Sequence, residues 1–76
     1  VDFMVSIYSA LAGPIGESLH VADLGGMRHQ SAARFVYEHP RAVAVVVSQD
    51  RRATLFVWKD DARAVAAVRG MEHFVG

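Results

Sequence analysis

The residues best suited to bind a ligand lie together at the start of one segment of this 76-residue chain. Two glycines are followed by a run of hydrogen-bond donors, and the set is Gly25, Gly26, Arg28, His29, Gln30 and Ser31. Glycines at the start of a helix let a ligand approach the first backbone N–H groups, which have no partner within the helix. The helix dipole adds partial positive charge there. The pattern therefore predicts a site for anionic oxygens, of which phosphate is the usual example.

The alternative is that the two glycines only form a turn, since short motifs of this kind often match by chance. A helix is in either case expected directly after them. Ala32, Ala33 and Val36 follow His29 by three, four and seven residues, which is the spacing of one helical face. The helix is predicted to cover residues 27–38 and to end at His39, because the residue before a proline is pushed out of the α region.

Three strands are expected around this helix. Residues 2–11 alternate in the period of a strand, and residues 41–48 and 53–59 form the arms of a hairpin closed by residues 49–52. The segment 41–48 is apolar on both sides, which predicts an interior strand covered on both faces. The first strand, the helix and this valine-rich strand are expected to form one right-handed crossover unit.

The remaining segments are predicted from their turn and cap residues. Gly and Pro are expected to end the first strand at residues 12–16, and residues 17–23 fit either a short helix or an irregular loop. A second helix is expected over residues 61–69, with Asp60 as its N-cap and Gly70 as its end. The predicted fold class is α/β: a small mixed β-sheet flanked by helices, in a single domain or domain fragment spanning residues 1–76.

The composition limits the functional classes. The chain is 53% hydrophobic and 21% charged, which is typical of a globular domain. Eight basic and eight acidic residues cancel, so no general nucleic-acid or membrane surface is expected. Without cysteine there is neither a disulfide framework nor a thiolate zinc site, which is compatible with a cytoplasmic location. No membrane span or signal peptide is recognisable, and the start at Val1 suggests a segment of a longer protein.

The run Gly26-Met27-Arg28-His29-Gln30-Ser31-Ala32, the strand Val43-Ala44-Val45-Val46-Val47-Ser48-Gln49 and the following hairpin resemble the diadenylate cyclase domain. This domain occurs in the DNA-integrity scanning protein and its membrane-bound relatives, and the similarity covers residues 10–59. The resemblance implies that Arg28 and His29 grip nucleotide phosphates and that Ser31 is the hydroxyl beside them. Asp50 matches, more weakly, an acidic residue after the valine strand of some members.

The departures from the family pattern bear on catalysis. Met27 stands where the family has Thr, and Gln30 replaces a second Arg, which removes a charged planar donor suited to phosphate. The family's metal-binding Asp-Gly-Ala motif does not occur in this chain. We therefore expect a catalytically degenerate sensor that binds an adenine nucleotide or a cyclic dinucleotide. Two alternatives remain. One is an active cyclase, with Mg²⁺ or Mn²⁺ held by a motif outside this segment, and the other is a purely structural or interaction module. Besides the nucleotide, the expected partners are a second copy of the chain or other domains of a longer chain.

Other polar and aromatic residues allow further functional interpretations: metal binding, stacking on a base and contact with a phosphate. Glu17 and His20 have a spacing that would face one way on a helix and could ligate a metal. Phe56 and Trp58 could stack on a base, although aromatic residues of a small domain are more often core. The pair Arg51-Arg52 fits either a phosphate contact or a solvated turn.

Overall fold

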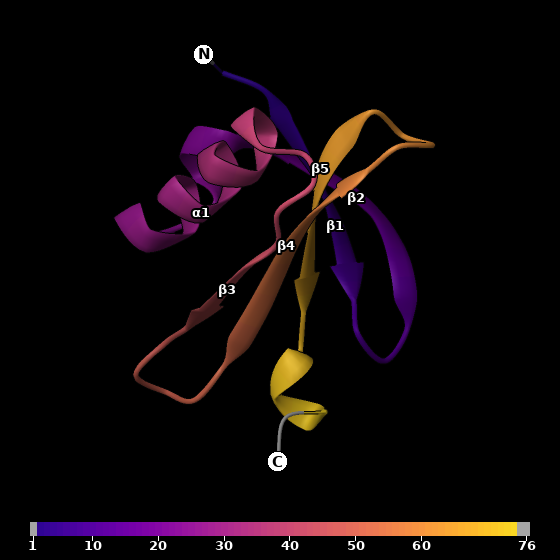
Figure 1. Cartoon of the computed structure of the whole chain (residues 1–76). Helices are drawn as coiled ribbons and strands as arrows, with labels where there is room; N and C mark the ends of the chain where they lie inside the picture. Colours follow the sequence, from indigo (N-terminus) through magenta and orange to yellow (C-terminus); the bar gives the residue numbers. More distant parts are fainter. Residues whose placement is uncertain (1, 75–76) are drawn as a thin grey trace.

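The computed structural model describes residues 2–74, which form a five-stranded mixed β-sheet with one α-helix against one of its faces (Figure 1). The elements in chain order are β1 (Met4–Ser9), β2 (Gly13–His20), the 3₁₀ turn η1 (Val21–Asp23), α1 (Met27–Glu38), β3 (Ala44–Val47), β4 (Ala53–Lys59), β5 (Ala64–Arg69) and the 3₁₀ turn η2 (Met71–His73).

The sheet consists of two antiparallel hairpins joined by the last strand of the chain. Its order is β2-β1-β5-β4-β3, so β5 lies in the centre between β1 and β4. The pairing of β5 with β1 is parallel, whereas its pairing with β4 is antiparallel. Because β4 is antiparallel to both β3 and β5, the carboxyl ends of these two strands lie at the same end of the sheet. The candidate site lies at this end.

The hydrophobic core lies between α1 and the sheet. Alternate residues of the strands face the helix, as expected for the period of two in a strand. Buried side chains from the sheet are Val5, Ile7, Val46, Phe56, Val65 and Ala67, and α1 contributes Ala33 and Val36. The predicted helical face is therefore confirmed, with its small residues where helix and sheet pack.

Several predicted elements are confirmed. The helix covers Met27–Glu38 as expected, and its C-cap is His39, immediately before Pro40. The strand predicted at residues 53–59 is β4, and the first strand is β1 within residues 2–11. The valine-rich segment forms the shorter β3, which pairs with β4 across the predicted hairpin turn.

The helix predicted for residues 61–69 is wrong, because this segment forms β5. Its alanines favour a helix intrinsically, but the gap between β1 and β4 gives a strand two hydrogen-bonded partners, and this tertiary context outweighs propensity. Asp60 is not a helix cap. Its carbonyl accepts from the Arg63 N–H at 3.3 Å in a turn where Arg63 has a φ of 50°.

The break expected after the first strand lies earlier than predicted, at the turn of residues 10–12. Gly13 and Pro14 begin β2, which pairs antiparallel with β1 over its whole length except at an irregularity beside Ile7 and Tyr8. Gly13 and Gly16 have φ values of 80° and 69°, so they shape this strand instead of ending the sheet. Of residues 17–23, only Val21–Asp23 forms a short 3₁₀ turn.

The valine-rich strand is an edge strand, not an interior one. β3 pairs with β4 on one side only, and Val43, Val45 and Val47 are 63%, 56% and 58% exposed. β1 and β3 do not form the predicted crossover unit of adjacent strands, because β5 and β4 lie between them. Apolar side chains on both faces of a strand do not reveal whether its backbone pairs with a neighbour along one edge or along both.

The small mixed α/β fold is thus confirmed, but α1 covers a single face, so the sheet is not flanked by helices on both. The opposite face carries mainly apolar side chains, and the Lys59 ammonium lies 5.5 Å from the centre of the Tyr8 ring on this side. Among residues 2–74, no helix has the length and apolar character needed to cross a membrane.

We predict that Ile7→Val lowers the free energy of unfolding by about 0.5–1.5 kcal/mol, because Ile7 is fully buried and a lost methylene leaves a gap. The matched control is Ile15→Val in β2, where the side chain is 48% exposed and the change should be within about 0.5 kcal/mol. Urea denaturation of both variants measures the difference. Equal effects would contradict the placement of the core.

Candidate functional site

The start of α1 has the open backbone expected from its two glycines. Gly25 has a φ of 113°, a conformation that favours glycine, and Gly26 is the N-cap with extended backbone. No side chain caps this end of the helix, and space is open around both glycines where a Cβ would lie. Backbone N–H groups of the first turn are therefore accessible to an acceptor from outside.

Gln30 holds the loop that precedes the helix. Its side-chain amide nitrogen donates to the carbonyl oxygens of Ala22 and Gly25, at 3.4 and 3.3 Å. These bonds tie η1 and the glycine loop to the first turn of α1. Gln30 therefore shapes the loop, whereas the sequence suggested a direct ligand contact.

Two adjoining cavities lie beside this helix start, and we call them together the basic groove. The first, of about 450 Å³, is lined by His29, Ser48, Arg52, Ala53, Thr54, Arg69, Gly70 and Glu72. The second, of about 340 Å³, is lined by Gly26, Met27, Arg28, His29, Val46, Val47, Ser48 and Gln49. His29 and Ser48 line both cavities, and each volume falls in the range of small-molecule sites.

His29 connects the groove to the core. Its ring lies 6.1 Å from the ring of Phe56 in an edge-on arrangement, and it is half-buried between helix and sheet. Phe56 is fully buried, so its ring is part of the hydrophobic core and cannot stack on a nucleotide base. This contact fixes the imidazole at the junction of the two cavities, where its nitrogen atoms can meet a ligand.

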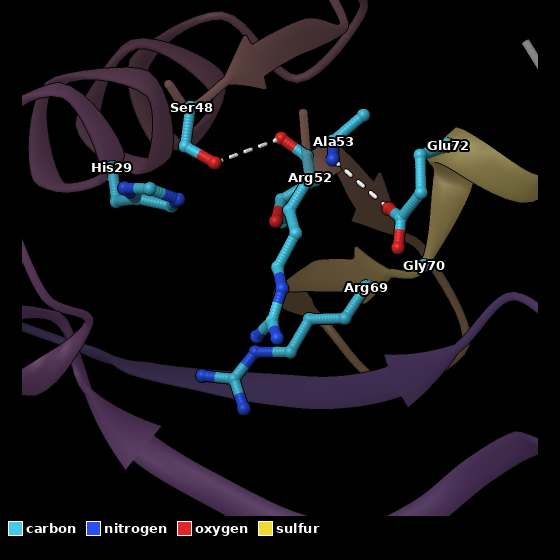
Figure 2. Close-up of a pocket in the computed structure, with 8 residues that line it drawn as sticks. His29, Ser48, Arg52, Ala53, Arg69, Gly70 and Glu72 are labelled. Atoms are coloured by element: carbon cyan, nitrogen blue, oxygen red, sulfur yellow. Dashed lines mark hydrogen bonds between the residues drawn. The ribbon is translucent and has the colours of Figure 1, made fainter. Parts of the chain in front are cut away.

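Arginine side chains give the groove its charge. Figure 2 shows the side chain of Arg52, from the turn just before β4, and that of Arg69, the last residue of β5, extending toward the same region of the view. Arg69 has no ion-pair partner among the described residues, and Arg52 pairs only with Asp50 there, at 3.4 Å. With Arg28 from the helix start, three arginines line the groove against one lining carboxylate, Glu72.

The turn between β3 and β4 positions two residues of the groove. The Ser48 N–H donates to the Arg52 carbonyl at 2.9 Å, and Arg51 adopts a φ of 67° to close the turn. The Ser48 hydroxyl donates to the Asp50 carboxylate. This hydrogen bond, helped by the backbone N–H and the guanidinium of Arg52, lowers the pKa of Asp50 below its ordinary value.

Glu72 closes the other side of the first cavity. The Ala53 N–H donates to its carboxylate at 3.0 Å, which Figure 2 marks as a dashed line. This bond is the main reason why the pKa of Glu72 is lowered, and the charges of His73 and Arg52 act in the same direction. The contact ties η2 to the first residue of β4 and keeps the carboxylate at the groove wall.

The predicted site residues therefore separate into three groups. Gly26, Arg28 and His29 line the basic groove. Gly25 and Gln30 form and hold the loop. The remaining two lie elsewhere: Ser31 lines a different cavity, on the outer side of β3, and Asp50 lies in the hairpin turn, where it holds Ser48 and Arg52.

Sequence reasoning missed Arg69 and Glu72 as groove residues. Both were hidden by the incorrect helix at residues 61–69, which placed Arg69 on a helix end and gave Glu72 no partner. Arg52 was considered for a phosphate contact, and the structure places it at the groove wall. A strand interpretation of residues 64–69 would have brought Arg69 to the same end of the sheet as Ser48.

The weaker metal-binding reading does not fit the structure. Glu17 and His20 lie on β2, not on a helix, and the His20 Nδ1 accepts from the Ala22 N–H while its Nε2 lies 3.7 Å from Asp2. Within residues 2–74, no three histidine or acidic side chains gather in a group that could hold a metal ion.

Comparisons of this chain with protein-family models, curated proteins and solved structures found no match. The resemblance to the diadenylate cyclase domain therefore rests on the sequence motifs alone.

We predict that Glu72→Gln makes stability less dependent on pH in the acid range. Because the pKa of Glu72 is lowered on folding, its contribution is complete above the ordinary value of 4.5 and is lost as the pH falls through the lowered pKa. The unfolding temperature of the wild type should therefore fall more steeply below this value than that of the variant. Thermal unfolding followed by circular dichroism across the acid range measures the two slopes.

Glu17→Gln is the matched control, because Glu17 is exposed on β2, away from the groove. Its pH profile should follow that of the wild type. If Glu72→Gln and Glu17→Gln change the profile equally, the Ala53–Glu72 contact does not contribute as described.

Proposed function

We propose that this domain binds an adenine nucleotide or a cyclic dinucleotide, with its phosphates in the basic groove, and that it acts as a sensor without cyclase activity. The observation that carries the proposal is the joining of the uncapped start of α1 to a cavity lined by arginines, through His29 and Ser48. Phosphate oxygens accept hydrogen bonds from backbone N–H groups at helix starts and from guanidinium groups.

The expected recognition of phosphate and the expected recognition of adenine rest on different features of the chain. Recognition of phosphate rests on the groove, where Arg28, Arg52 and Arg69 outnumber the lining carboxylate. Recognition of adenine rests on the resemblance to the diadenylate cyclase domain. The sensor role follows from the missing Asp-Gly-Ala motif and from Gln30, whose amide is bonded to the loop carbonyls instead of being free for a phosphate.

The size of the groove also fits this class of ligand. Its larger cavity is comparable with sites for drug-sized molecules, and polar groups from α1, β4, β5, η2 and the β3–β4 turn line it. Because Arg28 and Arg69 line the two cavities that share His29, we expect a ligand with two phosphate groups to contact both arginines. A single inorganic phosphate uses only one of these cavities, so we expect it to bind more weakly than a nucleotide.

We predict that Arg28→Ala and Arg69→Ala each weaken nucleotide binding by about tenfold to a hundredfold without unfolding the domain, since each removes a charge-assisted hydrogen bond. Both side chains are exposed, so their loss leaves the core intact. Titration calorimetry with ATP and with cyclic di-AMP measures the affinities, and circular dichroism checks the fold.

Arg41→Ala is the matched control, because it removes the same charge at the loop between α1 and β3, away from the groove. It should bind like the wild type after allowance for a small long-range charge effect. Equal affinity of Arg28→Ala, Arg69→Ala and the wild type would exclude the groove as the site. Failure of either nucleotide at millimolar concentration to raise the melting temperature of the wild type would favour a structural or interaction module.

A further inference from the structure

We propose that two copies of this domain associate through the free edge of β3, which pairs antiparallel with its symmetry mate and extends the sheet across a two-fold axis near Val45. The proposal does not depend on nucleotide binding. Its starting point is the unequal treatment of the two edges of the sheet, because an unpaired edge strand offers its backbone to any strand that fits.

The β2 edge is protected against such pairing. Pro14 lacks a backbone N–H, the left-handed Gly13 and Gly16 bend the strand, and the β1–β2 ladder is irregular beside Ile7. β3 has none of these features. Ala44–Val47 contains no proline, glycine or charged residue, although its outward valines are more than half exposed. One edge of this sheet is therefore blocked, and the other is open.

The backbone of β3 has the correct phase for pairing with a second copy. Since the Ser48 N–H donates to the Arg52 carbonyl, these residues form a hydrogen-bonded pair, and so, two residues back, do Val46 and Thr54. The alternate residues Val45 and Val47 then direct their N–H and C=O groups to the free side. These are the groups that an antiparallel neighbour requires.

A two-fold axis at Val45 makes this edge self-complementary. It places Val45 opposite Val45 of the second copy and Val43 opposite Val47, and it keeps all these side chains on one face of the extended sheet. Ala44 and Val46 pair on the helix side in the same way. The sequence Val43-Ala44-Val45-Val46-Val47 is apolar at every position, so no register partner brings like charges together.

The helix beside this edge extends the apolar surface. Met27, Ser31 and Phe35 lie at intervals of four residues on α1, so they share one side of the helix. Met27 and Ser31 lie beside Val45 and Val47, and Phe35 lies beside Ala42 just before β3. The helix thus runs opposite to β3, and the same axis brings the Met27 end of one α1 level with the Phe35 end of the other.

The exposed apolar side chains and the charges agree with a second copy as the occupant. Met27 is 77% exposed and Phe35 49% on the helix side of this edge, and the three outward valines are 56–63% exposed on the other side. Apolar side chains therefore flank the free edge on both faces of the sheet, where a partner strand with its own helix would cover them. Arg28 and Glu38 flank opposite ends of the helix stripe, so antiparallel helices set unlike charges toward each other.

Val45→Lys tests this interface, because a charged edge residue blocks strand pairing while it remains exposed in the single copy. Light scattering after size exclusion, from micromolar to millimolar protein, should show a wild-type dimer. The variant should dissociate about a hundredfold more readily, since two valines leave the interface and two like charges oppose each other. Ile15→Lys, the same change on the β2 edge, should remain dimeric. Circular dichroism verifies that both variants fold.

A single cysteine tests the register, since the natural chain has none. In antiparallel pairing the two Cα atoms at position 45 lie about 5.5 Å apart, within the range that a disulfide spans. Val45→Cys should therefore form a covalent dimer under mild oxidation, and the control Ile15→Cys should not. A wild type that is monomeric throughout overturns the proposal. So does a dimer that survives Val45→Lys, or one in which positions 15 and 45 cross-link equally.

Discussion

The packing of the first turns of α1 over Phe56 determines where the basic groove lies in this domain. Phe56 is fully buried in the middle of β4, and the edge of the His29 ring rests against it. Because this contact fixes the depth and direction of the helix start, the free N–H groups of α1 lie at the end of the sheet where β3 and β5 finish. The two cavities of the basic groove meet at this imidazole.

The polar contacts around the groove serve mainly to hold its walls. Gln30 ties down the glycine loop, Asp50 orders the hairpin turn, and Glu72 joins η2 to β4. Each of these groups is committed to a backbone or side-chain partner, whereas Arg69 has no ion-pair partner in the described part of the chain. The groove thus combines an ordered frame with unpaired positive charge, which is the combination that recognition of an anion requires.

The sequence predicted the local features of this arrangement well. The helix, its apolar face, the two glycines before it and the β3–β4 hairpin follow from spacing and turn residues, which act over a few positions. Neighbour relations across the sheet could not be predicted in this way. The alanine-rich segment 64–69 is a strand because it fills a gap between β1 and β4, and a valine run is equally apolar in an interior or an edge strand. Arg69 and Glu72 were missed because residues 61–69 were predicted to form a helix.

The central position of β5 has a consequence for how the chain folds. The β1–β2 hairpin and the β3–β4 hairpin with α1 are each built from local contacts, but they share no ladder until residues 64–69 arrive between them. During synthesis the amino-terminal five-sixths of the domain must therefore wait, with Val5, Ile7 and Phe56 incompletely covered, for the final strand. Removal of only this last short strand would divide the sheet in two, whereas loss of an edge strand would narrow it.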